Sequence, residues 1–254
     1  MAITIDLSGK SAIVTGGGRG IGRETALLFA QAGARVTIAD MDEASAQRVA
    51  EEIRAKGGAA VAARTDVTRA EEAQAMAKAA LAAHGRIDIL VNNAAVWTTK
   101  LFKDMTPQDY DRDIRVTLYG TLNCSRAVLD PMMEQKYGHI VNLISDAGRI
   151  GEPYLTVYSA AKGGVAAFTK ALAKEVGRYS ITVNGVAPGI TNTPGAQGFI
   201  EGAGGAEKIA KAYPLRRLAE PIDIANVILF LASDLSAYMT GQIFSASGGY
   251  STVG

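Results

Sequence analysis

The chain has 254 residues, with 26 Lys and Arg against 25 Asp and Glu, so its formal net charge is +1. This balance argues against a basic surface for nucleic acid. The single cysteine, Cys124, excludes an intrachain disulfide, and without a CxxC or HExxH motif we expect no ordinary metal site.

The first ten residues lack the apolar run that is typical of a signal peptide. No uncharged apolar stretch reaches the ~18–20 residues that a membrane-spanning helix needs. We therefore expect a cytoplasmic protein with no membrane segment. The 28 glycines exceed the roughly 18 that average composition predicts for this length, so some of them should serve particular turns.

Short apolar runs alternate with longer helical patterns along the whole chain. Because the runs are apolar almost throughout, they indicate parallel strands that helices cover on both faces, joined by right-handed crossovers. This predicts one doubly wound α/β domain over residues 1–254. The predicted strands are residues 11–15, 35–39, 60–64, 87–91, 139–144, 181–186 and 242–245, and the predicted helices are residues 20–32, 43–56, 69–84, 107–129, 157–178 and 221–232.

Residues typical of helix ends support these boundaries. Thr68-Arg-Ala-Glu71 predicts a capping box, and Thr106-Pro107 predicts an N-cap followed by a proline in the first turn. Three glycines are placed to end helices, namely Gly33, Gly57 and Gly85. The Gly-rich stretch that begins at Gly189 is too long for a simple turn, so we predict a mobile lid at about residues 189–215.

The first predicted strand runs into the turn Thr15-Gly-Gly-Gly-Arg-Gly-Ile-Gly22. Glycines let a backbone turn tightly and approach a pyrophosphate, whose charge the N–H groups of the following helix meet. The spacing differs from GxGxxG, and Arg23-Glu24 excludes a P-loop, so a flexible strand–helix turn is the alternative. The predicted dinucleotide contacts in this turn are Gly16, Gly18, Arg19, Gly20, Ile21 and Gly22.

Asp40 ends the second predicted strand, where an acidic side chain can bond the adenine ribose hydroxyls. Its charge would repel the 2′-phosphate of NADP, whereas Arg19 could pair with that phosphate. We give the repulsion more weight and predict NAD as the cofactor.

Five motifs in order resemble the short-chain dehydrogenase/reductase family: the glycine turn, Asn92-Asn93-Ala94, Ser145, Tyr158-Ser-Ala-Ala-Lys162 and Pro188-Gly189. The resemblance covers essentially the whole chain. It implies a Rossmann-like sheet of seven parallel strands, a nicotinamide cofactor and a homo-oligomer, a tetramer or dimer built on the fourth and fifth helices. It also implies further cofactor contacts at Asp66, Val67, Asn93, Ala94, Pro188, Gly189, Ile190 and Thr193.

Tyr158 and Lys162 are four residues apart on one predicted helix and therefore share a face. A free tyrosine, with a pKa near 10, is a poor base at neutral pH, but a neighbouring ammonium and a positive nicotinamide would both lower that pKa. We expect Ser145 to hold the substrate oxygen while Tyr158 transfers the proton. The resemblance implies that Lys162 also bonds the nicotinamide ribose. An exposed helix face is the alternative for the Tyr–Lys pair.

The chain departs from the family at Val116-Thr117-Leu118, where the family usually has Val-Asn-Leu and the Asn holds a water near the lysine. Either Thr117 and the main chain still position that water, or turnover is slow. We favour the first hypothesis and keep Thr117 as a candidate catalytic residue.

Four residues are candidates for the substrate side of the site: Trp97, Arg149, Leu155 and Phe199. Arg149 could reach a carboxylate or a coenzyme A phosphate, although a solvated loop charge is the alternative. The segments around Ser145-Asp-Ala and Ser247-Gly-Gly resemble dehydrogenases of alicyclic hydroxyacyl-CoA esters and also 3-oxoacyl thioester reductases.

The sequence therefore predicts an NAD-dependent oxidoreductase for a secondary alcohol or ketone, with a hydroxyacyl-CoA ester or another cyclic or aryl alcohol as candidate substrate. An NADPH-dependent 3-oxoacyl thioester reductase is the alternative within this class. In a different class, the chain could be a non-catalytic dinucleotide-binding sensor or scaffold. A serine hydrolase is disfavoured because no GxSxG motif occurs.

Overall fold

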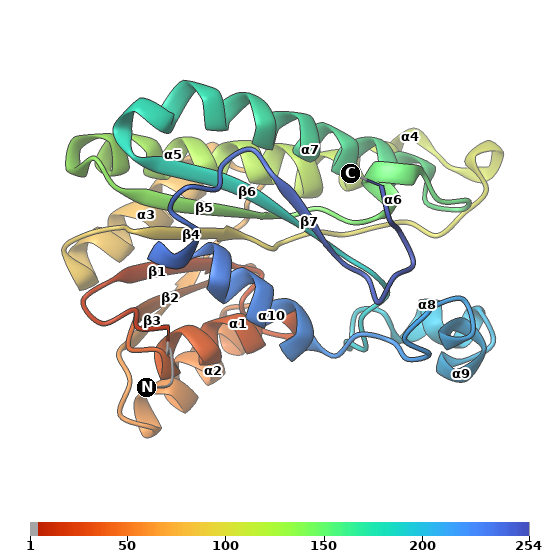
Figure 1. Ribbon diagram of the computed structural model, residues 1–254, viewed down its shortest axis with the longest axis horizontal. Coiled ribbons are helices and arrows are strands. Elements are labelled where there is room, and N and C mark those ends of the chain that lie inside the picture. The colour runs from red at the N-terminus through yellow and green to blue at the C-terminus, as the bar shows by residue number, and fades with distance from the viewer. Residues whose placement is uncertain (1–4, 254) are drawn as a thin grey trace.

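The computed structural model describes residues 5–253, in which seven parallel strands form one sheet (Figure 1). Residues 1–4 and 254, which the predicted domain includes, lie outside the described residues. The strand order is β3-β2-β1-β4-β5-β6-β7, so the chain returns to the middle of the sheet between β3 and β4. The strands are β1 (Ser11–Thr15), β2 (Arg35–Asp40), β3 (Ala60–Arg64), β4 (Ile89–Asn92), β5 (Gly138–Leu143), β6 (Ile181–Pro188) and β7 (Ile243–Ala246).

Helices cover both faces of this sheet, as the periodicity predicts (Figure 1). Three of them pack on one face: α1 (Gly20–Gln31), α2 (Glu43–Ala55) and α10 (Pro221–Leu231). Three pack on the other: α3 (Ala70–His84), α5 (Gly120–Gln135) and α7 (Thr156–Val176). Short helices complete the chain: α4 (Pro107–Ile114), α6 (Ala147–Ile150), α8 (Gln197–Gly202) and α9 (Ala206–Ala210). Among residues 5–253, no helix combines the length and apolarity that a bilayer crossing requires.

Each central strand supplies side chains to two separate hydrophobic cores. Val14 of β1 belongs to the core under α1, α2 and α10, whereas its neighbour Ile13 belongs to the core under α3, α5 and α7. Val91 and Leu90 of β4 divide in the same way. Successive side chains of a strand point to opposite faces, so a strand buried on both faces must be apolar at every position. This explains the apolar runs from which the strands were predicted.

The helical segment predicted over residues 107–129 occurs, but it is not a regular α-helix throughout. α4 ends at Ile114, a π-helical turn occupies Arg115–Tyr119, and α5 runs on to Gln135. A π turn adds a residue to the helical turn and is frequent at functional sites. The extra residue shifts the helical periodicity by only one position, and the sequence pattern did not reveal it.

The predicted caps are confirmed with one exception. Thr106 forms a capping box with Asp109, and Gly33, Gly57 and Gly85 have the positive φ angles of helix C-termini. The capping box at Thr68 is wrong, because α3 begins after Arg69 with no side-chain cap. The Thr68 hydroxyl donates instead to Asp66, 2.8 Å away.

The predicted lid segment leaves the carboxyl end of β6 and folds into α8 and α9. Its own small core consists of Ala196, Ile200, Tyr213 and Leu218, with Trp97 packed against it from the loop after β4. Movement of this segment stays a prediction.

A chain of buried amides crosses the core under α5 and α7. The Asn92 side-chain amide of β4 donates to Asn142 of β5 at 2.8 Å and to Ser125 of α5 at 2.9 Å. Asn142 in turn donates to Thr169 of α7 at 2.9 Å. Because all four side chains are buried, each needs these partners in place of water.

We expect Asn142→Ala to lower the free energy of unfolding by about 2–3 kcal/mol, because it leaves buried partners unpaired. Urea denaturation followed by circular dichroism measures this change. Gln47→Ala, which removes an exposed side-chain hydrogen bond to Glu51, is the control and should change it by less than about 0.5 kcal/mol. Equal effects of the two substitutions would contradict the role of the amide chain.

Candidate functional site

A cavity of about 560 Å³ opens at the carboxyl ends of the strands. Its wall is built from segments that follow each of the strands β1 to β7 and are distant in sequence. In open parallel sheets, ligands bind in this crevice, where the strand order reverses. Here the reversal lies between β1 and β4, which pair with each other although β2 and β3 separate them in the chain.

The glycine turn after β1 packs so tightly that side chains are excluded from it. A Cβ on Gly22 would lie 2.2 Å from the carbonyl oxygen of Gly16, and one on Gly18 would lie 2.7 Å from the Cβ of Ser45. The Asn93 amide donates to the carbonyl oxygens of Thr15 and Gly16, at 2.9 and 3.0 Å, and ties the turn to the loop after β4. The turn therefore brings bare backbone and the start of α1 to the cavity, which fits a phosphate group.

The predicted residues of this turn fall into two groups, those that line the cavity and those that do not. Gly16, Arg19, Gly20 and Ile21 line the cavity. Gly18 and Gly22 do not line it, but their lack of a side chain allows the turn to close behind it.

Asp40 is held at the edge of the cavity by two backbone N–H groups. Its Oδ2 accepts from Gly18 at 2.9 Å and its Oδ1 accepts from Asp42 at 3.0 Å. Arg19 lines the same cavity. Asp40, the candidate for binding the ribose hydroxyls, and Arg19, the candidate for binding a 2′-phosphate, thus both line this cavity.

The other predicted cofactor residues all line the cavity: Asp66, Val67, Asn93, Ala94, Pro188, Gly189, Ile190 and Thr193. The carbonyl of Val67 accepts from the Asn123 amide of α5 at 2.9 Å, which fixes the loop after β3. The backbone N–H of Ile190 donates to the Tyr213 hydroxyl at 2.9 Å, which fixes the loop after β6.

Ser145, Tyr158 and Lys162 converge in the same cavity. Ser145 follows β5, and its hydroxyl is near enough to Tyr158 to act on the pKa of that side chain. Lys162 lies one turn further along α7, with its Nζ 5.7 Å from the centre of the Tyr158 ring. Its ammonium donates to the carbonyl oxygen of Leu143 at the end of β5, and the residue is only 2% exposed.

Burial dominates the electrostatics of this pair. It raises the pKa of Tyr158 above the ordinary value of tyrosine, while the nearby Ser145 hydroxyl opposes the rise. It lowers the pKa of Lys162 to about 7. The expectation that Lys162 and a positive nicotinamide together lower the pKa of Tyr158 stays a prediction, and in this structure burial is the largest influence on that pKa.

Thr117 is fully buried in the π-helical turn and does not line the cavity. Its hydroxyl donates to the carbonyl oxygen of Val96 at 3.0 Å and accepts from the N–H of Val96 at 3.3 Å. A hydroxyl has one donor, and here that donor is used. The Thr117 side chain is thus in contact with the loop after β4, and its catalytic role stays a prediction.

Three of the four substrate candidates lie where the sequence predicts. Trp97, Leu155 and Phe199 line the cavity, and the Trp97 and Tyr158 rings have centres 5.9 Å apart. Arg149 does not line it, and a contact between this residue and a substrate carboxylate or coenzyme A phosphate stays a prediction. Its guanidinium donates to Ser245 and to the carbonyl oxygen of Val253 instead.

Among the lining residues that the sequence analysis missed, four have titratable side chains: Asp146, Glu152, Tyr213 and Tyr250. The rings of Tyr213 and Tyr250 stack with their centres 5.1 Å apart, and the Tyr250 hydroxyl donates to Glu152 at 2.7 Å. No motif marks these positions, since 37 residues separate the two tyrosines in the chain. Within residues 5–253, no group of three His, Cys, Asp or Glu side chains is arranged to hold a metal ion.

Comparisons with known proteins agree with this arrangement. A family model described as enoyl-(acyl carrier protein) reductase matches residues 16–251. The chain is 40% identical over 245 residues to (2S)-[(R)-hydroxy(phenyl)methyl]succinyl-CoA dehydrogenase subunit BbsD of Thauera aromatica, covering 96% of this chain and 98% of that one. It is also 40% identical over 245 residues to a 3-oxoacyl-[acyl-carrier-protein] reductase of Synechocystis, covering 96% and 97%.

A solved structure described as a short-chain alcohol dehydrogenase from Sinorhizobium meliloti superposes with a TM-score of 0.92 at 36% identity, covering 96% of this chain and 97% of that one. The fold, the cavity and the full-length matches lead to one conclusion. The chain is an oxidoreductase of the short-chain dehydrogenase/reductase family.

Proposed function

We propose that this protein transfers a hydride between NAD and a bulky, largely apolar secondary alcohol or its ketone. The convergence of Ser145, Tyr158 and Lys162 in one cavity with the glycine turn is the observation that carries the proposal. It also argues against a non-catalytic sensor, which would not need a buried ammonium beside a tyrosine.

The residues of the cavity fit a dinucleotide. The bare backbone between Gly16 and Gly20 would meet the diphosphate, Asp40 the adenine ribose, and the loop from Pro188 to Thr193 the nicotinamide. When bound, the nicotinamide ring supplies the hydride acceptor or donor.

The proton chemistry falls to residues of this chain. The Ser145 hydroxyl can hold the substrate oxygen, and the Tyr158 hydroxyl can take the alcohol proton or return it to the ketone. Because burial raises the pKa of Tyr158, its phenolate needs stabilisation in the working site. The Lys162 ammonium is the nearby group that can provide it, and the carbonyl of Leu143 keeps that ammonium in place.

Tyr158→Phe should lower kcat by about 10²–10⁴-fold, because the proton donor and acceptor is lost while the ring keeps its packing. NADH fluorescence at 340 nm excitation measures turnover with a panel of secondary alcohols and ketones. The dissociation constant for NADH, from fluorescence titration, should change by less than threefold. Activity within a few-fold of the wild type would refute the assignment of Tyr158.

The rate of alcohol oxidation should rise with pH between 6 and 9, because the base must be deprotonated and burial raises the pKa of Tyr158. Below the apparent pKa, kcat/KM should increase by about tenfold per pH unit. Ketone reduction uses the protonated tyrosine and should not show this rise. Measuring both directions across the range checks the sign, and an oxidation rate that already falls with rising pH below pH 7, where the Lys162 ammonium is still charged, would exclude Tyr158 as the base.

The preference for NAD rests on Asp40. Its carboxylate is fixed by the N–H groups of Gly18 and Asp42, so it cannot easily turn away from a 2′-phosphate. Arg19 on the same cavity supports the alternative, an NADPH-dependent 3-oxoacyl thioester reductase.

Replacing Asp40 by Asn keeps the shape of the side chain and removes its charge. We expect the ratio of kcat/KM for NAD⁺ to kcat/KM for NADP⁺ to fall at least about tenfold, as a like-charge repulsion of roughly 1.4 kcal/mol disappears. Glu43→Gln is the control, because it also removes one negative charge but at an exposed position at the start of α2. It should leave the ratio unchanged. A wild-type enzyme that prefers NADP⁺ would overturn the proposal.

The substrate side of the cavity supports a bulky, mainly apolar substrate. Trp97, Leu155, Phe199 and Tyr213 form its wall, and Arg149 is turned away from it. The named relatives act on thioesters of coenzyme A or acyl carrier protein, so a hydroxyacyl thioester remains a candidate on that ground. A panel of free aryl and cyclic alcohols beside hydroxyacyl-CoA esters separates the two, since good turnover of the alcohols with no turnover of any thioester would exclude the thioester.

Assembly as a tetramer or dimer and a location in the cytoplasm stay predictions from the sequence and the family resemblance. Size-exclusion chromatography with light scattering measures the assembly directly.

A further inference from the structure

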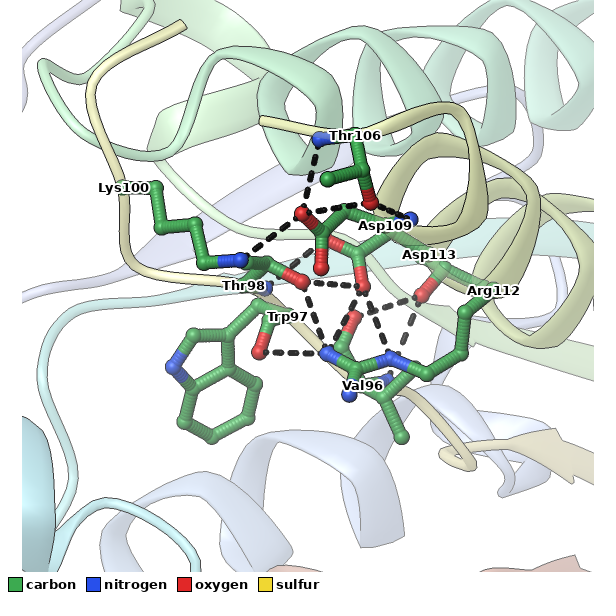
Figure 2. A network of polar contacts seen from close by, with 9 residues as sticks. Val96, Trp97, Thr98, Lys100, Thr106, Asp109, Arg112 and Asp113 are labelled. Atoms are coloured by element: carbon green, nitrogen blue, oxygen red, sulfur yellow. Dashed lines mark hydrogen bonds and ion pairs between the residues drawn. The ribbon is translucent and has the colours of Figure 1, made fainter. Parts of the chain in front are cut away.

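The loop that carries Trp97 is tied to α4 and the π-helical turn by a polar network (Figure 2). Asp113 of α4 accepts from the backbone N–H of Thr98 at 2.7 Å and from its hydroxyl at 3.1 Å. The Arg112 guanidinium donates to the hydroxyl of Thr98 at 2.7 Å, to the carbonyl oxygen of Trp97 at 3.3 Å and to Asp113 at 3.1 Å. We call Thr98, Arg112 and Asp113 the loop clamp.

The clamp contains a fully buried charge. Asp113 is 0% exposed and is the one buried residue of α4, a position at which a helix normally presents an apolar side chain. A buried carboxylate is costly unless it is paired and hydrogen-bonded. Asp113 has an N–H, a hydroxyl and a guanidinium as partners, so both of its oxygens are satisfied.

Three successive residues of the loop are thereby fixed through their main chain. Val96 exchanges two hydrogen bonds with Thr117, Trp97 accepts one from Arg112, and Thr98 donates one to Asp113. With its carbonyl held, Trp97 directs its indole away from the clamp, as Figure 2 shows.

On the far side of the clamp, the indole connects two parts of the cavity. Its ring lies 5.9 Å from the ring of Tyr158, at 57° to it. It also packs against the core of the segment that contains α8 and α9, which includes Ile200 and Tyr213. The position of one side chain therefore affects both the catalytic tyrosine and the wall that faces the substrate.

We propose that Asp113, together with Arg112, is a positioning residue that fixes Trp97 against Tyr158 and so sets the space open to the substrate. The inference rests on the proposed function for its catalytic consequence, but the geometry of the clamp is independent of it. The charge of Asp113 also raises the pKa of Tyr158, which couples the clamp to the proton transfer.

The chain offers a direct readout, because Trp97 is its only tryptophan. Tryptophan fluorescence, excited at wavelengths that the nine tyrosines do not absorb, therefore reports on the clamped loop alone. Asp113→Asn keeps the shape and removes the charge, and Arg112→Ala removes the guanidinium, which is half-exposed and therefore unlike a core residue. Asp109→Asn is the matched control, because it makes the same chemical change on the same helix outside the clamp. The Asp109 carboxylate accepts from the Lys100 ammonium at 2.8 Å and from the N–H of Thr106.

We expect acrylamide quenching of Trp97 to increase at least about twofold in Asp113→Asn and in Arg112→Ala, with a lower fluorescence anisotropy, and to stay unchanged in Asp109→Asn. Far-UV circular dichroism confirms that each variant is folded. If Asp113→Asn does not fold, Arg112→Ala alone decides. Unchanged quenching in every folded clamp variant, or an equal increase in Asp109→Asn, would overturn the proposal.

A second experiment measures the turnover of a small and of a bulky secondary alcohol by the wild type and by each variant. In the clamp variants the ratio of their kcat/KM values should change at least about fivefold, while the dissociation constant for NADH stays within threefold. In Asp113→Asn the apparent pKa of oxidation should fall, because the negative charge that disfavours the phenolate is gone. An unchanged ratio together with an unchanged pH profile would refute the positioning role. Absence of any alcohol turnover in the wild type would instead refute the proposed function, and the fluorescence arm would still test the clamp.

Discussion

The pairing of β1 with β4 is the constraint on which the site depends. These strands are neighbours in the sheet, although β2 and β3 separate them in the chain. The segments that follow β1 and β4 therefore lie side by side at the carboxyl ends of the strands. One of these segments is the glycine turn and the other is the loop that begins at Asn93. The Asn93 amide joins them by bonding the carbonyls of Thr15 and Gly16, and the loop then continues to Trp97 and the clamp. The glycine turn, the cavity and the wall that contains Trp97 are thus connected through the loop after β4.

Buried polar groups place the functional side chains around this stretch. The ammonium of Lys162 is held by the carbonyl of Leu143, and the carboxylate of Asp113 by Thr98 and Arg112. In a low-dielectric interior each such group is costly unless its partners are in place, so few arrangements of the surrounding loops are tolerated. The same burial that fixes Lys162 also raises the pKa of Tyr158. The hydroxyl proton of Tyr158 is therefore harder to remove than that of a free tyrosine.

Much of the fold was predictable from local patterns. All seven strands occur, and two of them, β1 and β3, have the predicted bounds. A central strand such as β1 leaves a continuous apolar run because it is buried on both faces. The π-helical turn at Arg115–Tyr119 and the missing cap at Thr68 were not predictable, since tertiary contacts decide them. The π turn carries Thr117 to Val96, and Thr68 bonds Asp66 instead of the start of α3.

The sequence by itself determined the parallel α/β fold, the glycine turn and the trio Ser145, Tyr158 and Lys162, because each is expressed as a residue type at a fixed local spacing. Only the tertiary structure decided that Arg149 turns away from the cavity, that Tyr213 and Tyr250 line it, and that Asp113 is a buried charge behind Trp97. These features join residues far apart in the chain. Their partners are selected by how the loops pack at the carboxyl ends of the strands, and loop packing leaves no periodic pattern in a sequence.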